Sequence, residues 1–110
     1  MVKAIALIKR KPGLSREDFR QHYEEVHAPL ILKHLPGLKK YVRNHIIVPA
    51  GTEEPEFDCI TELWYDSMKD YEASIAVWRT DAGQVIRDDE DSFLNRSKLA
   101  FFIVEENVSS

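Results

Sequence analysis

The chain has 110 residues, of which 44% are hydrophobic and one is cysteine, so we expect a single domain, residues 1–110, without an internal disulfide. The formal net charge of −4 and the short basic patches argue against a nucleic-acid partner. No stretch approaches the roughly 18 apolar residues of a membrane span, and the N-terminal segment lacks the order of a signal peptide, so we expect a cytoplasmic protein.

The first part of the chain predicts a strand followed by a helix. Residues Val2 to Lys9 are mostly apolar, and Lys11-Pro12-Gly13 is typical of a strand end. Ser15 is suited to cap the following helix, with Asp18 in the third helical position. Pro29 lacks a backbone N–H, so we expect the helix to kink or stop near this residue.

This helix carries the first candidate for function, His27. An α-helix turns by about 100° per residue, so Tyr23, Val26 and Leu30 lie within about 40° of Phe19 around the helix axis and form an apolar stripe. His27 lies about 80° from Phe19, at the edge of that stripe. An imidazole at such an edge suits proton transfer near neutral pH. The alternative is a structural histidine that hydrogen-bonds a backbone carbonyl.

The second predicted strand, Leu38 to Val48, has two faces of different character. One face carries more aliphatic side chains, and we expect it to pack on the helices; its residues are Leu38, Lys40, Val42, Asn44, Ile46 and Val48. The other face presents Tyr41, Arg43 and His45 in a row. Such a row lines either a polar pocket or an ordinary solvated surface. An exposed loop, Pro49 to Pro55, is expected next.

The third predicted strand, Phe57 to Tyr65, is ambiguous because both of its alternating sets contain apolar residues. Glu62 lies between Ile60 and Trp64 on one set. A carboxylate in such surroundings has a raised pKa and can act as an acid or base, or it forms a structural ion pair.

A second helix is expected from Met68 to Trp78, with a core stripe of Tyr71, Ile75 and Trp78. Residues 80–93 continue irregularly or helically and contain the acidic run 88–91. We interpret that run as a solvated face, with a divalent-cation site as the alternative. The last strand, Lys98 to Glu105, is apolar on both sets and is expected to be buried on both faces.

The order β-α-β-β-α-β predicts an α+β, ferredoxin-like arrangement, in which two helices cover one face of an antiparallel sheet. The apolar last strand implies that the other face is also covered. Pairing of two such sheets across a twofold axis would cover it, and we expect a cavity between the paired sheets.

Four segments of the chain, in order and suitably spaced, resemble the EthD family. They are Tyr23-x-x-x-His27-x-Pro29-Leu30, Leu35-Pro36-Gly37-Leu38-x-x-Tyr41, Glu62-Leu63-Trp64-Tyr65, and Asp89-x-x-x-Phe93 before a strand closing on Glu105. The resemblance implies a homodimeric α/β barrel. It also implies the chemistry of relatives that isomerise lactones, or decarboxylate or dehydrate hydroxylated polycyclic substrates, without a metal or organic cofactor.

The resemblance places His27 at the cavity and a strand tyrosine, Tyr41, facing it. In this hypothesis His27 moves a proton α to a carbonyl and Tyr41 donates to the developing enolate oxygen. The predicted catalytic residues are His27, Tyr41 and His45, and the predicted substrate-binding residues are Tyr23, Arg43, Glu62, Trp64 and Tyr65. Leu63 stands where a lactone-isomerase relative has cysteine.

Two other functions fit the same sequence. One is a noncatalytic protein that binds a hydrophobic metabolite or serves an oxygenase system, for which the aromatic residues matter more than His27. The other is a cofactor-free monooxygenase that activates oxygen through an electron-rich substrate. No histidine stands out as an axial haem ligand.

Overall fold

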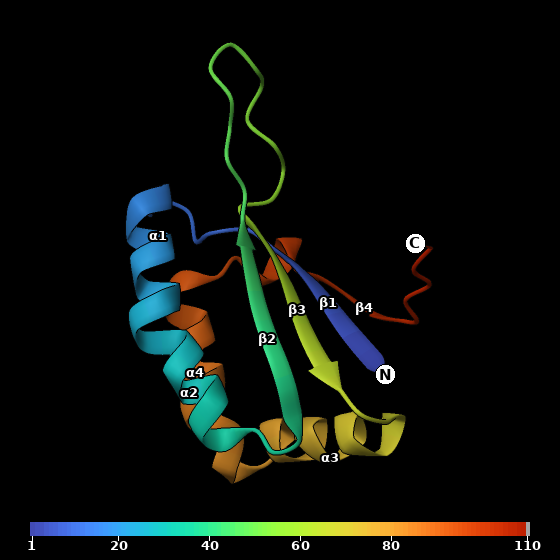
Figure 1. Cartoon of the computed structure of the whole chain (residues 1–110). Helices are drawn as coiled ribbons and strands as arrows, with labels where there is room; N and C mark the ends of the chain where they lie inside the picture. The colour runs from blue at the N-terminus through green and yellow to red at the C-terminus, as the bar shows by residue number, and fades with distance from the viewer. Residues whose placement is uncertain (110) are drawn as a thin grey trace.

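The computed structural model describes residues 1–109 and contains one four-stranded antiparallel sheet (Figure 1). The sheet order is β2-β3-β1-β4, and the strands are β1 (Val2–Ile8), β2 (Leu38–His45), β3 (Cys59–Tyr65) and β4 (Ala100–Val104). All three pairings are antiparallel. The α+β, ferredoxin-like fold predicted from the sequence is therefore confirmed.

The helices lie on one side of this sheet. They are α1 (Arg16–His22), the π-helical turn η1 (Tyr23–His27), α2 (Ala28–His34), α3 (Met68–Arg79), the 3₁₀ turn η2 (Asp81–Gly83), α4 (Gln84–Phe93) and the 3₁₀ turn η3 (Arg96–Lys98). The continuous helix α1-η1-α2 packs beside α4, and α3 lies across the end of β2 and β3 (Figure 1). Across residues 1–109 the helices are too short or too polar to traverse a bilayer.

The sequence predicted a kink or a stop near Pro29, and the first helix does not stop there. It begins as expected, because the Ser15 side chain accepts a hydrogen bond from the backbone N–H of Asp18. It then widens into a π turn, in which the backbone N–H of Ala28 reaches the carbonyl of Tyr23. A proline has no N–H for the carbonyl four residues earlier and its ring crowds that carbonyl, so the wider turn lets the helix continue.

The π turn also changes which side chains face the sheet. Phe19, Tyr23 and His27 are 1%, 2% and 3% exposed, whereas Val26 is 42% exposed. A π turn holds more residues per turn than an α-helix, so residues four apart stay on one face instead of drifting round it. The prediction that Val26 lies inside and His27 at the edge was therefore wrong.

The predicted faces of β2 were also wrong. A β-bulge interrupts the pairing of β2 with β3 between Leu38 and Lys40. Such an extra residue reverses the alternation beyond it. As a result the row Tyr41, Arg43 and His45 faces the helices, and Val42 faces away from them with Glu62 beside it.

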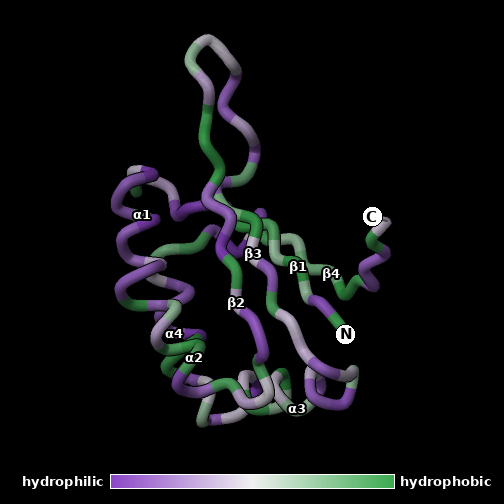
Figure 2. The backbone as a smooth tube through the Cα atoms, in the orientation of Figure 1, coloured by the Kyte–Doolittle hydropathy of each residue, from purple (hydrophilic) through white to green (hydrophobic). Residues whose placement is uncertain are grey.

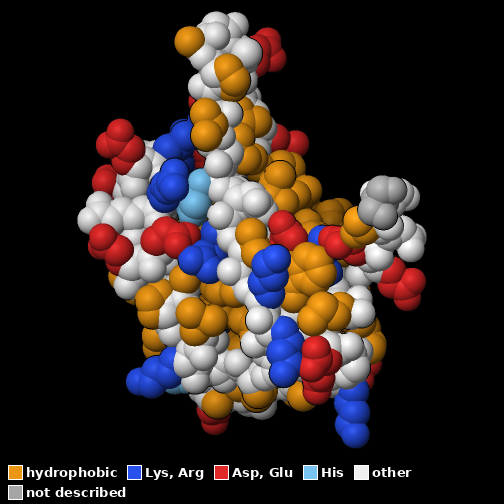
Figure 3. Space-filling model, viewed as in Figure 1, with side chains coloured by type: hydrophobic (Ala, Val, Ile, Leu, Met, Phe, Trp, Pro, Cys, Tyr) orange, Lys and Arg blue, Asp and Glu red, His pale blue; other side chains and the backbone are white. Residues whose placement is uncertain are grey.

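The last strand is not buried on both faces in the single chain. Phe101, Phe102 and Ile103 are 44%, 52% and 40% exposed. β4 is an edge strand whose one sheet neighbour is β1. The hydropathy colouring shows β1 and β4 as a largely apolar pair, and hydrophobic side chains remain exposed alongside the sheet (Figures 2 and 3).

The connection between β2 and β3 extends away from the body of the molecule and returns at Asp58 (Figure 1). The Asp58 carboxylate is 2% exposed and accepts hydrogen bonds from the backbone N–H and the guanidinium of Arg10 and from the guanidinium of Arg16. It therefore joins the ends of β1 and α1 to the start of β3.

We expect Asp58→Asn to destabilise the fold. Burial opposes ionisation of Asp58, but the Arg10 and Arg16 donors outweigh it and lower its pKa. The carboxylate therefore stabilises the protein above the usual Asp pKa of about 4 and ceases to do so as pH falls through the lower folded-state value.

Denaturant unfolding of Asp58→Asn at pH 7 should give a loss of about 1–3 kcal/mol in the free energy of unfolding, and the loss should shrink toward pH 2. The exposed Asp66→Asn serves as control. A loss that is equal at both pH values would contradict the ionic role of Asp58.

Candidate active site

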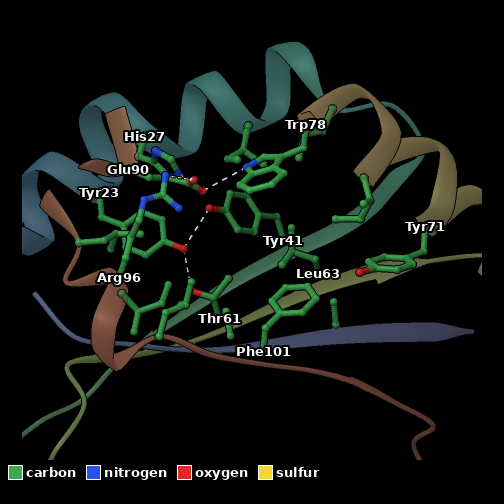
Figure 4. Close-up of a pocket in the computed structure, with 18 of the residues that line it drawn as sticks. Tyr23, His27, Tyr41, Thr61, Leu63, Tyr71, Trp78, Glu90, Arg96 and Phe101 are labelled. Carbon is green, nitrogen blue, oxygen red and sulfur yellow. Dashed lines mark hydrogen bonds and ion pairs between the residues drawn. The ribbon is translucent and has the colours of Figure 1, made fainter. Parts of the chain in front are cut away.

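A cavity of about 320 Å³ lies between the sheet and the helices of the same chain (Figure 4). This cavity lies within one chain, whereas the sequence predicted a cavity between the paired sheets of two copies. Ala4 and Ala6 of β1 form part of its wall, and their small side chains leave space for the cavity above the central strand of the sheet. The volume is at the lower end of the ~300–1,000 Å³ that is usual for small-molecule pockets.

Most of the cavity wall is aromatic or aliphatic. Its lining includes Ile8, Tyr23, Ile31, Leu35, Tyr41, Leu63, Tyr65, Tyr71, Ile75, Trp78, Phe93, Leu94, Leu99 and Phe101. The Tyr71 and Phe101 rings are stacked, with 6.4 Å between their centroids. Such a wall favours a flat, apolar ligand and allows few polar anchors.

The polar end of the cavity begins with His27. Its Nδ1 lies 2.9 Å from Oδ2 of Asp89 on α4. The other Asp89 oxygen lies 2.8 Å from Nε2 of His22. Because a carboxylate only accepts, Nδ1 of His27 carries the proton, and Nε2 of a neutral ring is left as a hydrogen-bond acceptor.

Burial keeps this imidazole uncharged. Desolvation lowers the pKa of His27 below its usual value of 6.5, and the hydrogen bond with Asp89 opposes that effect only in part. The result is a neutral, oriented base at neutral pH. Asp89 thus fixes the orientation and the tautomer of the His27 ring.

Glu90, one residue along α4, reaches the same end of the cavity (Figure 4). Its Oε2 lies 3.4 Å from the indole N–H of Trp78 and 3.9 Å from Nε2 of His27. Its Oε1 accepts a hydrogen bond from Arg96 at 3.1 Å. Burial raises the pKa of Glu90, although Arg96 and the Trp78 N–H counteract this.

A chain of hydroxyl groups crosses the cavity from β2 to β3. Tyr41 donates to the Tyr23 hydroxyl at 3.1 Å, and the Tyr23 oxygen lies 2.7 Å from Oγ1 of Thr61. Burial raises the pKa of both tyrosines well above the usual value of 10.0. Both therefore stay protonated at neutral pH, and the proton of Tyr41 is engaged in its bond to the Tyr23 oxygen.

The predicted site residues divide into two groups. Four of them line the cavity, namely His27, Tyr41, Tyr23 and Tyr65. His45 and Arg43 lie behind it and bind Glu24, at 2.8 Å from His45 and 3.0 Å from the Arg43 Nε. These contacts, with that of Arg43 foremost, lower the pKa of Glu24 to about 2. Arg43 thus forms a structural ion pair with Glu24, and His45 adds a hydrogen bond to the same carboxylate.

The predicted residues Glu62 and Trp64 face the opposite side of the sheet. Glu62 accepts hydrogen bonds from Asn44 at 2.9 Å and from Lys3 at 3.3 Å. These partners, Asn44 first, lower its pKa, which is the reverse of the raised pKa considered for it. The alternation of β3 puts Cys59, Thr61, Leu63 and Tyr65 on the helix side instead.

The interpretation of residues 88–91 as a solvated face was wrong for two of the four. The side chains of Asp89 and Glu90 are only 13% and 15% exposed. Helical spacing from Ile86 to Phe93, both buried, places residues 89 and 90 on the inner face between them. That spacing was the signal that sequence reasoning missed.

Trp78, Glu90, Arg96 and Phe101 were not predicted as site residues, yet all four line the cavity. Trp78 belongs to the stripe interpreted as core, and Arg96 follows α4 in a 3₁₀ turn that no sequence pattern indicated. Within residues 1–109 no group of three or more His, Cys, Asp or Glu side chains is arranged to hold a metal ion.

The model of the EthD domain matches residues 11–97 of this chain. The chain belongs to the EthD family. A structure of an EthD-family protein from Bacillus halodurans C-125 is 31% identical, has a TM-score of 0.72, and is matched over 97% of this chain and 99% of that one.

Two curated fungal proteins are more distant relatives of this EthD chain. A decarboxylase of Passalora fulva is 29% identical over 77 residues, covering 56% of this chain and 49% of the fungal protein. A dehydratase of Gibberella zeae is 27% identical over 75 residues, covering 56% and 49%. The chain thus spans about half the length of the curated relatives it matches.

The fold is also found in proteins described as dimeric. A dimeric ferredoxin-like protein of Thermobifida fusca YX is 14% identical, with a TM-score of 0.65, and is matched over 94% of this chain and 88% of that one. At this identity the likeness concerns the fold.

We expect His27 to titrate below pH 6.5, because burial disfavours its cation. The pH dependence of its imidazole C–H resonances in two-dimensional NMR measures this. Asp89→Asn should lower the value further, since the carboxylate favours the protonated ring. An unchanged or higher pKa in Asp89→Asn would contradict the assigned contact.

Proposed function

We propose that this EthD protein catalyses acid–base chemistry, without a cofactor, on a small aromatic, polyketide-like or lactone substrate. The observation that carries the proposal is the Asp89–His27 pair at the end of an apolar cavity. Decarboxylation, dehydration and isomerisation all require a proton to move at carbon or oxygen, and a neutral oriented imidazole supplies the base.

The distant relationship to a decarboxylase and a dehydratase favours a lyase among these reactions. In the proposed step, Nε2 of His27 takes a proton from the substrate and later returns it. Asp89 stabilises the imidazolium that forms in between, as a carboxylate beside a catalytic histidine does.

The negative charge that develops on the substrate needs hydrogen-bond donors. Tyr41 and Tyr23 keep their protons at neutral pH and lie in the same cavity. We infer that one of them donates to the enolate or phenolate oxygen, and preorganised donors of this kind are a large source of catalytic stabilisation. The apolar wall holds the rings of the substrate and excludes water.

We further propose that the protein is a homodimer through the sheet face opposite the helices. This face carries an apolar set, Ile5, Leu7, Val42, Ile60, Trp64 and Phe102. The Phe102 side chain, at the edge strand, is 52% exposed in the single chain. A second copy placed across a twofold axis would cover this face.

Light scattering after size exclusion should show a dimer for the wild-type protein and a monomer for Phe102→Lys, because a charge would be buried without a partner. Leu32→Lys is the matched control, since Leu32 is 62% exposed and lies on the helix side. Dissociation by Leu32→Lys instead, or a wild-type monomer, would refute the proposed interface.

For activity, we expect His27→Gln to reduce kcat/KM by a factor of about 10² to 10⁴ without unfolding the protein. The measurement is turnover of lactones, anthrones, quinols and hydroxyaromatic β-keto acids, followed by mass spectrometry with dissolved oxygen monitored. Loss of carbon dioxide, loss of water or unchanged mass identifies the reaction, and His34→Gln is the control.

Two results would replace this proposal by another function. Consumption of oxygen with a quinol or anthrone would indicate a cofactor-free monooxygenase. Binding of the panel compounds without conversion would indicate a noncatalytic protein for a hydrophobic metabolite. A His27→Gln protein with full turnover would remove the imidazole from the mechanism.

A further inference from the structure

Arg79 is a charged side chain of the cavity lining that pairs with no carboxylate in the part of the chain that the structure describes. It is the last residue of α3 and is exposed to solvent. The other arginine of the lining, Arg96, pairs with Glu90 and Asp91. The guanidinium of Arg79 therefore keeps its N–H donors for water or for a ligand.

Helical spacing along α3 brings Arg79 to the cavity. Tyr71, Ile75 and Arg79 are four residues apart, so they share one face of α3, and all three line the cavity. Burial raises the pKa of Tyr71, and the nearby charge of Arg79 counteracts this. Phe101, whose ring stacks on that of Tyr71, is 44% exposed, so the cavity meets solvent on this side.

The formal charges of the cavity lining favour an anionic ligand. The lining has two guanidinium groups, Arg79 and Arg96, and one carboxylate, Glu90, in a chain whose net charge is −4. Glu90 lies 3.1 Å from Arg96 and offsets its charge directly. The charge of Arg79 is thus uncompensated. A cation beside an apolar, low-dielectric cavity attracts an anion more strongly than the same cation in water.

Resting on the proposed function, we propose that Arg79 binds a carboxylate group of the substrate, whose apolar remainder lies in the cavity. A guanidinium presents two parallel N–H donors that match the two oxygens of a carboxylate. One unpaired guanidinium also balances the single charge of a carboxylate, whereas a phosphate group carries more than one charge at neutral pH.

This carboxylate is an anchor and not the group that reacts. An ion pair with Arg79 stabilises the carboxylate of the bound substrate, and an interaction that is stronger in the ground state than in the transition state slows a reaction. The pair would therefore oppose loss of the same carboxylate as carbon dioxide. Figure 4 shows His27 at one end of the cavity and Tyr71, from the α3 face that carries Arg79, at the other.

Two matched probes test the anchor without turnover. 3-Phenylpropionate and 3-phenylpropionamide have nearly the same shape, and only the first is charged at neutral pH. In isothermal titration the wild-type protein should bind the carboxylate about tenfold or more tightly than the amide, as expected for hydrogen bonds between charged groups. The preference should fall at high ionic strength, because salt screens a charge that reaches solvent.

Variants of Arg79 separate a direct contact from a general effect of charge. Arg79→Gln should reduce the preference to about threefold or less, and Arg79→Lys, which keeps the charge but loses the paired donors, should give an intermediate value. Arg20→Gln is the matched control, because Arg20 is exposed on α1 outside the cavity lining and carries the same charge. It should keep the wild-type preference. Circular dichroism checks that each variant is folded.

The outcomes distinguish this inference from the proposed function. A preference for the carboxylate that depends on Arg79, without turnover of any panel compound, would support the anchor and reject the enzyme. Turnover by a protein that has no such preference, or that keeps it in Arg79→Gln, would reject the anchor alone. Failure of the wild-type protein to bind 3-phenylpropionate would also overturn the anchor.

Discussion

The position of His27 depends on a backbone constraint at Pro29. The proline has no N–H for the carbonyl four residues earlier, and the helix accommodates it with a π turn rather than a break. The turn retains Phe19, Tyr23 and His27 on the inner face over two successive turns. The imidazole thus reaches the cavity because of a residue that does not itself line it.

The other half of the polar end comes from α4, which is distant in sequence. Asp89 and Glu90 are adjacent and contact different atoms of one imidazole, Nδ1 and Nε2. The contact with Asp89 orients the ring and selects its tautomer. Glu90 places a carboxyl oxygen 3.9 Å from Nε2 of the same ring. Glu90 lines the cavity and Asp89 does not, but it is Asp89 whose hydrogen bond raises the pKa of the imidazole against the larger effect of burial.

Much of the fold could be predicted from the sequence. The strand and helix order, the Ser15 cap and the EthD relationship rest on local patterns that tertiary contacts did not override. The faces of the first helix and of β2 were mispredicted because a π turn and a β-bulge each shift a regular period, and neither has a reliable local pattern. His27, Tyr41, Tyr23 and Tyr65, which were predicted as site residues, line the cavity, whereas the inward position of Glu90 was missed because it belongs to an acidic run.

Cys59, the one cysteine of the chain, lies buried between the sheet and the helices, and this burial limits the access of reagents to its thiol. The side chain is 0% exposed beneath the first helix, and burial raises its pKa to about 11, so the nucleophilic thiolate is scarce in the closed protein. An alkylating reagent reaches this sulfur only when the helix layer separates from the sheet. The rate of Cys59 alkylation therefore reports how readily the helix layer opens.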